Sequence, residues 1–163
     1  MASSSGESKL KHRGSRTAPS YIGLKPASKH ASAAARGSSK KQDTKPEVLL
    51  RKALWRAGLR YRKNVASLPG NPDLVFPKAK IVIFCDGDFW HGRNWEARKS
   101  RLQRGTNASY WVKKIERNMM RDAELNRKLT ESGWVVVRFW ETDISTRLGE
   151  ITIEIIHLLS SRC

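Results

Sequence analysis

The sequence predicts an α/β fold in which a mixed β-sheet is flanked by helices. Short segments rich in β-branched and aromatic residues, such as residues 80–85 and 134–140, are typical of strands. Apolar side chains at helical spacing, including Trp111, Ile115 and Met119, predict a long helix over residues 109–132. Because both patterns occur within one chain of 163 residues, we expect a single sheet with helices packed against it.

The first element expected is a helix from Thr44 to about Ala57. Thr44 is expected to cap it, Glu47 to complete a capping box and Gly58 to end it. The other elements are expected in this order: strands over 59–65, 73–76 and 80–85, the long helix, a strand over 134–140 and a closing helix over 151–159. The strands 73–76 and 80–85 are expected to pair as an antiparallel hairpin, and a polar loop is expected to follow it.

The composition changes near Asp43 and divides the chain in two. Residues 1–43 carry nine basic and two acidic residues and almost no large apolar side chains, so we expect a disordered basic tail. A non-specific DNA-tethering arm and a transit-type peptide are the alternatives. Residues 44–163 keep 23 basic and 13 acidic residues and are expected to form the folded domain.

The overall charge indicates a polyanionic partner. The formal net charge is +17 and the isoelectric point about 10.5, which favours nucleic acid or an anionic membrane surface. No segment approaches the ~20 apolar residues of a membrane span, and no apolar signal sequence follows Met1, so we expect a soluble, unexported protein. The two cysteines, Cys85 and Cys163, fit a reducing compartment.

Candidate catalytic residues lie where the first strand of the predicted hairpin begins and where its second strand ends. Asp73 follows the rigid turn at residues 69–72, and the segment 85–92 begins where the neighbouring strand ends. The Asp73 carboxylate and the Cys85 backbone carbonyl are hard oxygen ligands that suit magnesium. His91 lies close enough in sequence to deprotonate a water molecule there.

Each of these residues also has a purely structural explanation. Asp73 fits ordinary turn chemistry, and Glu47 is fully accounted for as a helix-capping residue. Asp86 and Asp88 resemble an ordinary acidic loop, and His91 could be a loop histidine without a chemical role. The pattern alone leaves both interpretations open.

Taken together, the motifs resemble those of the very-short-patch-repair (Vsr) mismatch endonucleases from Thr44 to about Ile144. The matching segments are Thr44–Glu47, Leu68–Val75, Phe84–Gly92, Trp111 with Lys114–Ile115 and Asn118, Arg121–Asp122, Gly133–Val136 and Trp140–Glu141. The resemblance implies a fold related to the PD-(D/E)xK restriction enzymes. It also implies a Mg²⁺-dependent enzyme that nicks one DNA strand beside a T:G mispair in very short patch repair.

The resemblance assigns roles residue by residue. Asp73 matches the metal-binding aspartate, Cys85 the position whose carbonyl completes the metal site, and His91 the general base. Glu47 matches an acidic residue that supports the metal and its water molecules.

The resemblance also implies DNA contacts. Phe89 and Trp90 match aromatics that wedge into the base stack beside the mispair, although they could instead be core aromatics. Four basic residues are expected to contact the DNA backbone: Arg93, Lys113, Lys114 and Arg117. They could instead belong to a solvated helix face.

Two positions depart from the family pattern. The structural zinc of well-known members is held by cysteines and a histidine, but the matching positions here are Asp88, Arg93, Trp95 and Thr142. We therefore expect no structural zinc and suppose that packing around Trp95 replaces it. Asp86 stands where members often carry a histidine and is expected to be an extra magnesium ligand.

The partner implied is double-stranded, mismatched DNA, bound by a monomer in the bacterial cytoplasm at the nucleoid, with other DNA-repair proteins as further candidates. Two alternatives remain open. One is a restriction-like nickase without mismatch preference, and the other is a non-catalytic DNA-binding module.

Overall fold

The structure, a computed structural model, describes residues 19–20, 22–26 and 42–162. Most of the tail expected to be disordered, residues 1–43, lies outside the described residues. Among the described residues, no helix is long and apolar enough to cross a membrane.

A four-stranded mixed sheet forms the centre of the domain. Its strands are β1 (Arg62–Lys63), β2 (Leu74–Phe76), β3 (Ile81–Asp86) and β4 (Val135–Trp140), in the spatial order β1-β2-β3-β4. The pairs β1–β2 and β2–β3 are antiparallel, whereas β3 and β4 run parallel, with Asp86 opposite Trp140. The carboxyl ends of β3 and β4 therefore meet at one edge of the sheet.

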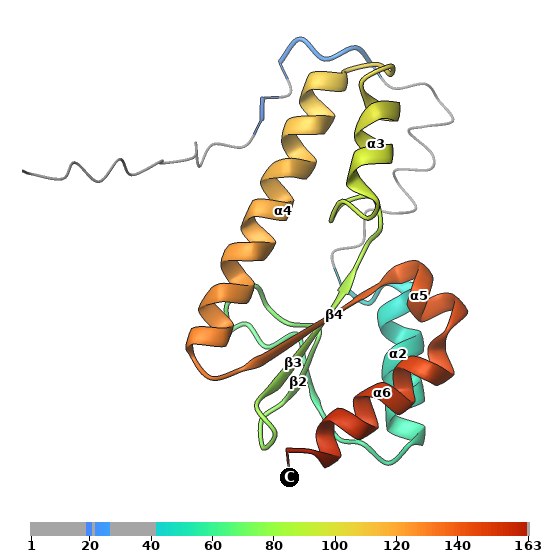
Figure 1. The fold of residues 1–163 in the computed structure, drawn as a ribbon, viewed down its shortest axis with the longest axis vertical. Coiled ribbons are helices and arrows are strands. Elements are labelled where there is room, and N and C mark those ends of the chain that lie inside the picture. The colour runs from blue at the N-terminus through green and yellow to red at the C-terminus, as the bar shows by residue number, and fades with distance from the viewer. Residues whose placement is uncertain (1–18, 21, 27–41, 163) are drawn as a thin grey trace, which may run out of the picture.

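Helices cover both faces of this sheet (Figure 1). On one side lie α2 (Lys45–Arg56), α5 (Glu141–Thr146) and α6 (Leu148–Ser160). On the other side α4 (Ala108–Glu131) runs along the sheet and extends beyond it, where α3 (Trp95–Leu102) lies beside it. The mixed α/β fold predicted from the sequence is confirmed.

The apolar pattern of β3 explains why it occupies a central position. Ile81 and Ile83 are fully buried in the core shared with α2, α5 and α6, whereas Val82 and Phe84 are buried in a smaller core that includes Leu129 of α4. A strand that is apolar on both faces must be covered on both faces.

Two helices were not expected from the sequence. The segment after β3 was expected to be a polar loop but contains α3. Because no residue of α3 is buried, the helix needs no apolar face, and its sequence has no helical apolar repeat that would predict it. Helix α5 has six residues and begins directly after β4, too short to leave a periodic pattern.

Two finer expectations were wrong. The strand expected over residues 59–65 is only two residues long, and at its end Asn64 leaves the extended conformation with φ of 48°. Thr44 precedes α2 as expected but makes no capping hydrogen bond to its backbone. Its hydroxyl instead donates to the Glu47 carboxylate at 2.8 Å.

Candidate active site

The β2–β3 hairpin places Asp73 against the end of β3. Asp73 immediately precedes β2, and its Oδ2 accepts a hydrogen bond from the Cys85 backbone N–H at 2.7 Å. The turn before it needs a left-handed backbone at Gly70, where φ is 80° and an added Cβ would lie 2.9 Å from the Leu125 side chain. The turn and the hairpin together hold this carboxylate beside the Cys85 backbone.

The surroundings of Asp73 disfavour its negative charge. The pKa of Asp73 is raised from 3.8 to about 6, chiefly by burial. The hydrogen bond from Cys85 acts in the opposite direction and lowers the pKa. The nearby carboxylates of Glu47 and Asp86 raise the pKa further, and Arg51 lowers it. A buried acid with two anionic neighbours is a place where a bound cation would relieve repulsion.

Glu47 lies in the first turn of α2 and is 5% exposed. Its carboxylate accepts hydrogen bonds from the Asp43 backbone N–H at 2.9 Å and from the Thr44 hydroxyl. These contacts give Glu47 a structural role at the start of α2, although the expected capping box is not formed. The charge of Glu47 also acts on Asp73. The two interpretations are compatible in one residue.

His91 is oriented by a carboxylate that sequence reasoning did not single out as functional. Its Nδ1 lies 2.5 Å from Oδ2 of Asp122, which projects from the middle of α4. Burial acts to raise the pKa of Asp122, but His91 and Arg138 outweigh it and lower that pKa. If Nδ1 carries the proton and donates it to Asp122, Nε2 is left with the free lone pair of a neutral imidazole.

A signal for Asp122 was present in the helix pattern. The residues that α4 buries include Ile115, Asp122 and Leu129, which follow one another at intervals of seven. An acidic residue at such a repeating inward position is unusual, because burying an unpaired charge is costly. Arg121–Asp122 is one of the segments that resemble the family, but Asp122 was not predicted to lie on the buried face of the helix.

Asp86 is held by Arg138 of β4. Arg138 donates from Nε to Oδ2 of Asp86 at 2.5 Å and from Nη2 to Oδ1 at 2.8 Å. The same guanidinium lies 3.3 Å from Asp122 and donates to Asn126 at 3.0 Å, and Nδ1 of His91 lies 3.7 Å from Asp86. Asp86, Asp122, Arg138 and His91 thus form one network between the end of β3, β4 and α4.

The two predicted wedge residues form part of an aromatic cluster. The ring centroids of Phe89 and Trp90 lie 5.0 Å apart, and those of Phe89 and Trp111 lie 5.8 Å apart. All three side chains are half-buried. Asn118 of α4 donates to the Trp90 carbonyl at 3.0 Å and anchors this segment to the helix.

One of the basic residues expected to contact DNA, Lys114, lies beside this cluster. Lys114 places its Nζ 5.3 Å from the centroid of the Trp90 ring, whereas Lys113 and Arg117 are exposed on α4. Arg93 is engaged within the protein, at 2.8 Å from Asp143 and 3.4 Å from Asp88.

The positions that match the family's zinc ligands do not offer the usual donors, and three of them are joined by polar contacts. Asp88 accepts hydrogen bonds from the Thr142 hydroxyl and from Arg93, and its backbone N–H donates to Glu141 at 2.9 Å. Trp95 takes no part in these contacts. Within the described part of the chain, no three His, Cys, Asp or Glu side chains are grouped as a metal site.

Comparisons with known proteins identify the family of this chain. Residues 27–97 match the family model of the DNA mismatch endonuclease Vsr. The chain is 47% identical over 128 residues to the type II nicking enzyme V.HpaIIP of Haemophilus parainfluenzae, covering 78% of this chain and 89% of the relative. It is 50% identical over 107 residues to the type II nicking enzyme V.NmeDIP of Neisseria meningitidis serogroup C, covering 66% and 71% of the two chains.

A third relative carries the mismatch activity in its name. The chain is 37% identical over 106 residues to the DNA mismatch endonuclease Vsr of Escherichia coli strain K12, covering 65% of this chain and 66% of that protein. With relatives this similar over most of their length, the chain belongs to the Vsr DNA mismatch endonuclease family and is a DNA endonuclease.

Proposed function

We propose that this endonuclease uses Mg²⁺ to nick one DNA strand beside a T:G mismatch, as a step of very short patch repair. The observation that carries the proposal is the placement of Asp73 beside the Cys85 backbone, close to the network that holds His91. The name of the Escherichia coli relative supports mismatch recognition.

The residues at the end of β3 fit a magnesium ion. Asp73 would hold it through its carboxylate and Cys85 through its backbone carbonyl, with Glu47 supporting the water molecules around it. Mg²⁺ commonly takes only one or two carboxylates and keeps several waters, so a site of three acidic side chains is not required. A bound cation would stabilise negative charge on the scissile phosphate and ease ionisation of water.

Asp86 fits a positioning role better than that of a ligand. Both of its oxygens accept hydrogen bonds from Arg138, and the Arg138 guanidinium also reaches Asp122. In our proposal Asp86 and Arg138 hold Asp122 and His91 in place, and Asp86 does not ligate the magnesium ion.

His91 acts as the general base. With Nδ1–H donating to Asp122, the Nε2 lone pair is available to accept a proton from the attacking water. Asp122 stabilises the imidazolium that forms, as a carboxylate partner of a catalytic histidine does elsewhere. As the water oxygen bonds to phosphorus, its proton moves to Nε2. The bond from phosphorus to the ester oxygen on the opposite side breaks, and that oxygen takes up a proton from solvent.

Mismatch recognition is assigned to the aromatic cluster. We propose that Phe89 and Trp90 enter the base stack beside the mispair, where unstacking costs less than at a paired step. Lys113, Lys114 and Arg117 contribute backbone contacts near this point of entry.

We further propose that residues 44–163 form the endonuclease domain, with a core related to the PD-(D/E)xK restriction enzymes. The domain acts as a monomer on DNA in the bacterial cytoplasm, where other repair proteins are candidate partners.

The deciding experiment compares nicking of two duplexes that differ only in carrying T:G or T:A at one position. We expect Mg²⁺-dependent nicking of the T:G duplex alone, strongly reduced in Asp73→Ala and in His91→Ala. Glu154→Ala, which removes an exposed acid from α6, is the control and should nick at the wild-type rate.

Each other outcome identifies an alternative. Equal nicking of both duplexes would indicate a nickase without mismatch preference. Binding without nicking by the wild type would indicate a non-catalytic DNA-binding module, and unchanged nicking in both site variants would refute the mechanism.

A further inference from the structure

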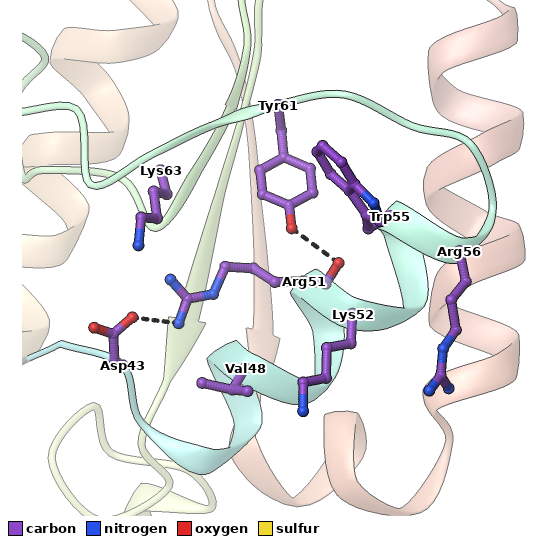
Figure 2. Close-up of a pocket in the computed structure, with 8 residues that line it drawn as sticks. All are labelled: Asp43, Val48, Arg51, Lys52, Trp55, Arg56, Tyr61 and Lys63. Atoms are coloured by element: carbon purple, nitrogen blue, oxygen red, sulfur yellow. Dashed lines mark hydrogen bonds and ion pairs between the residues drawn. The ribbon is translucent and has the colours of Figure 1, made fainter.

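A basic hollow of about 480 Å³ lies between α2 and the segment that leads into β1 (Figure 2). It is lined by Asp43, Val48, Arg51, Lys52, Trp55, Arg56, Tyr61 and Lys63. None of these residues belongs to the catalytic network described above. We call this feature the α2–β1 groove.

The charge of the α2–β1 groove is mostly uncompensated. Its one acidic residue, Asp43, is paired with Arg51 at 2.5 Å. The other cations, Lys52, Arg56 and Lys63, are exposed, and no carboxylate among the residues that the structure describes forms an ion pair with them. Three side-chain cations that line one groove, none of them paired with a described carboxylate, favour an anionic ligand.

The wall of the groove is built by aromatic packing. The Tyr61 hydroxyl donates to the Arg51 carbonyl at 2.9 Å, which ties the segment before β1 to α2 (Figure 2). Trp55 packs edge-on against Tyr61, with 6.5 Å between the ring centroids, and Arg60 stacks over Trp55 at 3.8 Å. The shape of the groove is therefore set by contacts within the protein.

The groove adjoins the catalytic centre through Arg51. Arg51 lines the groove, and its Nε donates to the backbone carbonyl of Glu47 one helical turn earlier. The charge of Arg51 also acts on Asp73. A polyanion that passes the catalytic centre on this side would meet the groove next.

We propose that the α2–β1 groove binds the sugar-phosphate backbone of the DNA substrate on one side of the cleaved bond. The inference rests on the proposed function and adds a phosphate-binding track that is separate from the aromatic cluster. Phosphate contacts of this kind position the duplex and carry no sequence information. The cations of the groove are thus expected to raise affinity for paired and mismatched DNA alike.

The test is a triple variant, Lys52→Gln, Arg56→Gln and Lys63→Gln, assayed for binding to a T:G and to a T:A duplex at several salt concentrations. Each lost phosphate contact should reduce the slope of log affinity against log salt by about 0.9, so three should reduce it by roughly 2 to 3. We expect at least about tenfold weaker binding to both duplexes at low salt.

A matched control carries the same change of charge at the opposite end of the sheet, in Lys78→Gln, Lys80→Gln and Arg162→Gln. Lys78 and Lys80 lie in the turn before β3, and Arg162 contacts the Ala79 carbonyl at 3.3 Å. We expect this control to keep a nearly wild-type slope. Denaturant midpoints measured for both variants exclude misfolding as the cause of a difference.

The outcomes separate the groove from the proposed function. An unchanged slope in the groove variant, or equal losses in both triple variants, would overturn the inference even if the wild type nicks T:G duplexes. If the wild type fails to nick, the proposed function fails, while the comparison of slopes still decides whether the groove binds DNA. A single neutral methylphosphonate near the nick that weakens the wild type but not the groove variant would identify the phosphate bound.

Discussion

Asp73 occupies an environment that opposes its own ionisation. Its pKa is raised to about 6, because the carboxylate is buried and lies near Glu47 and Asp86. In the unfolded chain the pKa would be near 3.8, so the folded state binds the proton more tightly. Stability is therefore lost as pH rises from about 4 to above 6, by a total on the order of 3 kcal/mol at neutral pH. This cost arises because the Asp73 carboxylate is buried near two other acidic side chains.

Asp73→Asn should stabilise the protein in the absence of divalent cations while abolishing nicking. The amide oxygen can still accept the Cys85 N–H, and the buried charge is removed. We expect the free energy of unfolding to rise by up to about 3 kcal/mol at pH 8 and by clearly less at pH 4.5. Urea denaturation in EDTA at the two pH values measures the difference.

The same variant separates electrostatics from packing. Added Mg²⁺ should stabilise the wild type and leave Asp73→Asn unchanged, because a ligand stabilises only the state that binds it. A stability gain of equal size at both pH values would show that ionisation of Asp73 is not its source.

Asp122→Asn should slow nicking without loss of DNA affinity. The amide cannot stabilise an imidazolium and can orient His91 in either tautomer, so we expect the single-turnover rate to fall by roughly 10² to 10⁴. Glu116→Gln, on the same helix and largely outside the buried network, is the control and should keep the wild-type rate. A rate within twofold of the wild type would argue against Asp122 as a positioning residue.

The loop between β3 and α3 carries His91 and two residues of the aromatic cluster, Phe89 and Trp90, and it is held from two sides. Asn118 of α4 binds the Trp90 carbonyl on one side, and Asp88 is joined to Glu141 and Thr142 of α5 on the other. At Gly92, φ is 76° and an added Cβ would lie 2.5 Å from the Met119 sulfur, so the loop approaches α4 as closely as its backbone allows.

Asp88→Ala should loosen this loop, because Thr142 and Arg93 lose a shared acceptor. We expect a loss of about 1–2 kcal/mol in the free energy of unfolding and faster amide exchange over residues 88–92. Discrimination between T:G and T:A duplexes should fall more than nicking itself, because the loop carries the aromatics.

Two controls accompany this measurement. Glu154→Ala should change neither exchange nor discrimination, and added zinc or a zinc chelator should leave the wild-type stability unchanged. Unaltered exchange over residues 88–92 in Asp88→Ala would show that the polar contacts to α5 do not hold the loop.

At the scale of the whole molecule, the parallel pair β3–β4 decides where the site forms. The carboxyl ends of both strands meet at one edge, so Asp86 and Cys85 of β3 come to lie beside the first residues of α5. The antiparallel β2 starts at that same edge and contributes Asp73. Helix α4 then brings Asp122 to the network from the opposite face of the sheet.

A chain that begins at Gln42 should remain folded and active. It keeps Asp43, whose N–H donates to Glu47, and loses the exposed contacts between Lys25 and Asn107. We expect cooperative unfolding with a free energy within about 1 kcal/mol of the full chain. DNA affinity should fall and depend less steeply on salt, because nine basic residues are removed.

Urea denaturation and salt-dependent binding of the two chains check this expectation. Loss of cooperative unfolding in the shorter chain would mean that the domain does not begin near residue 44.

Local patterns were sufficient to predict the central strands and two of the three long helices closely, and the last helix only in part. Strand β3 and helix α4 have apolar patterns long enough to predict a strand and a helix. The turn residues at 69–72 predict where the hairpin that follows Asp73 begins. The closing helix α6 was expected over residues 151–159 and runs from Leu148 to Ser160. Such features depend on neighbours in the chain, which the sequence displays directly.

The partners of the predicted site residues could not be derived in that way. Asp122 and Arg138 lie 31 and 52 residues from the groups they contact, His91 and Asp86, and no local spacing records such a pairing. The contacts of Asp88 with α5 likewise join residues more than 50 positions apart, which the parallel pairing of β3 and β4 brings together. Chain-local periodicity thus specifies which elements form and which residues can do chemistry, whereas the burial and pairing of charges depend on how distant segments pack together.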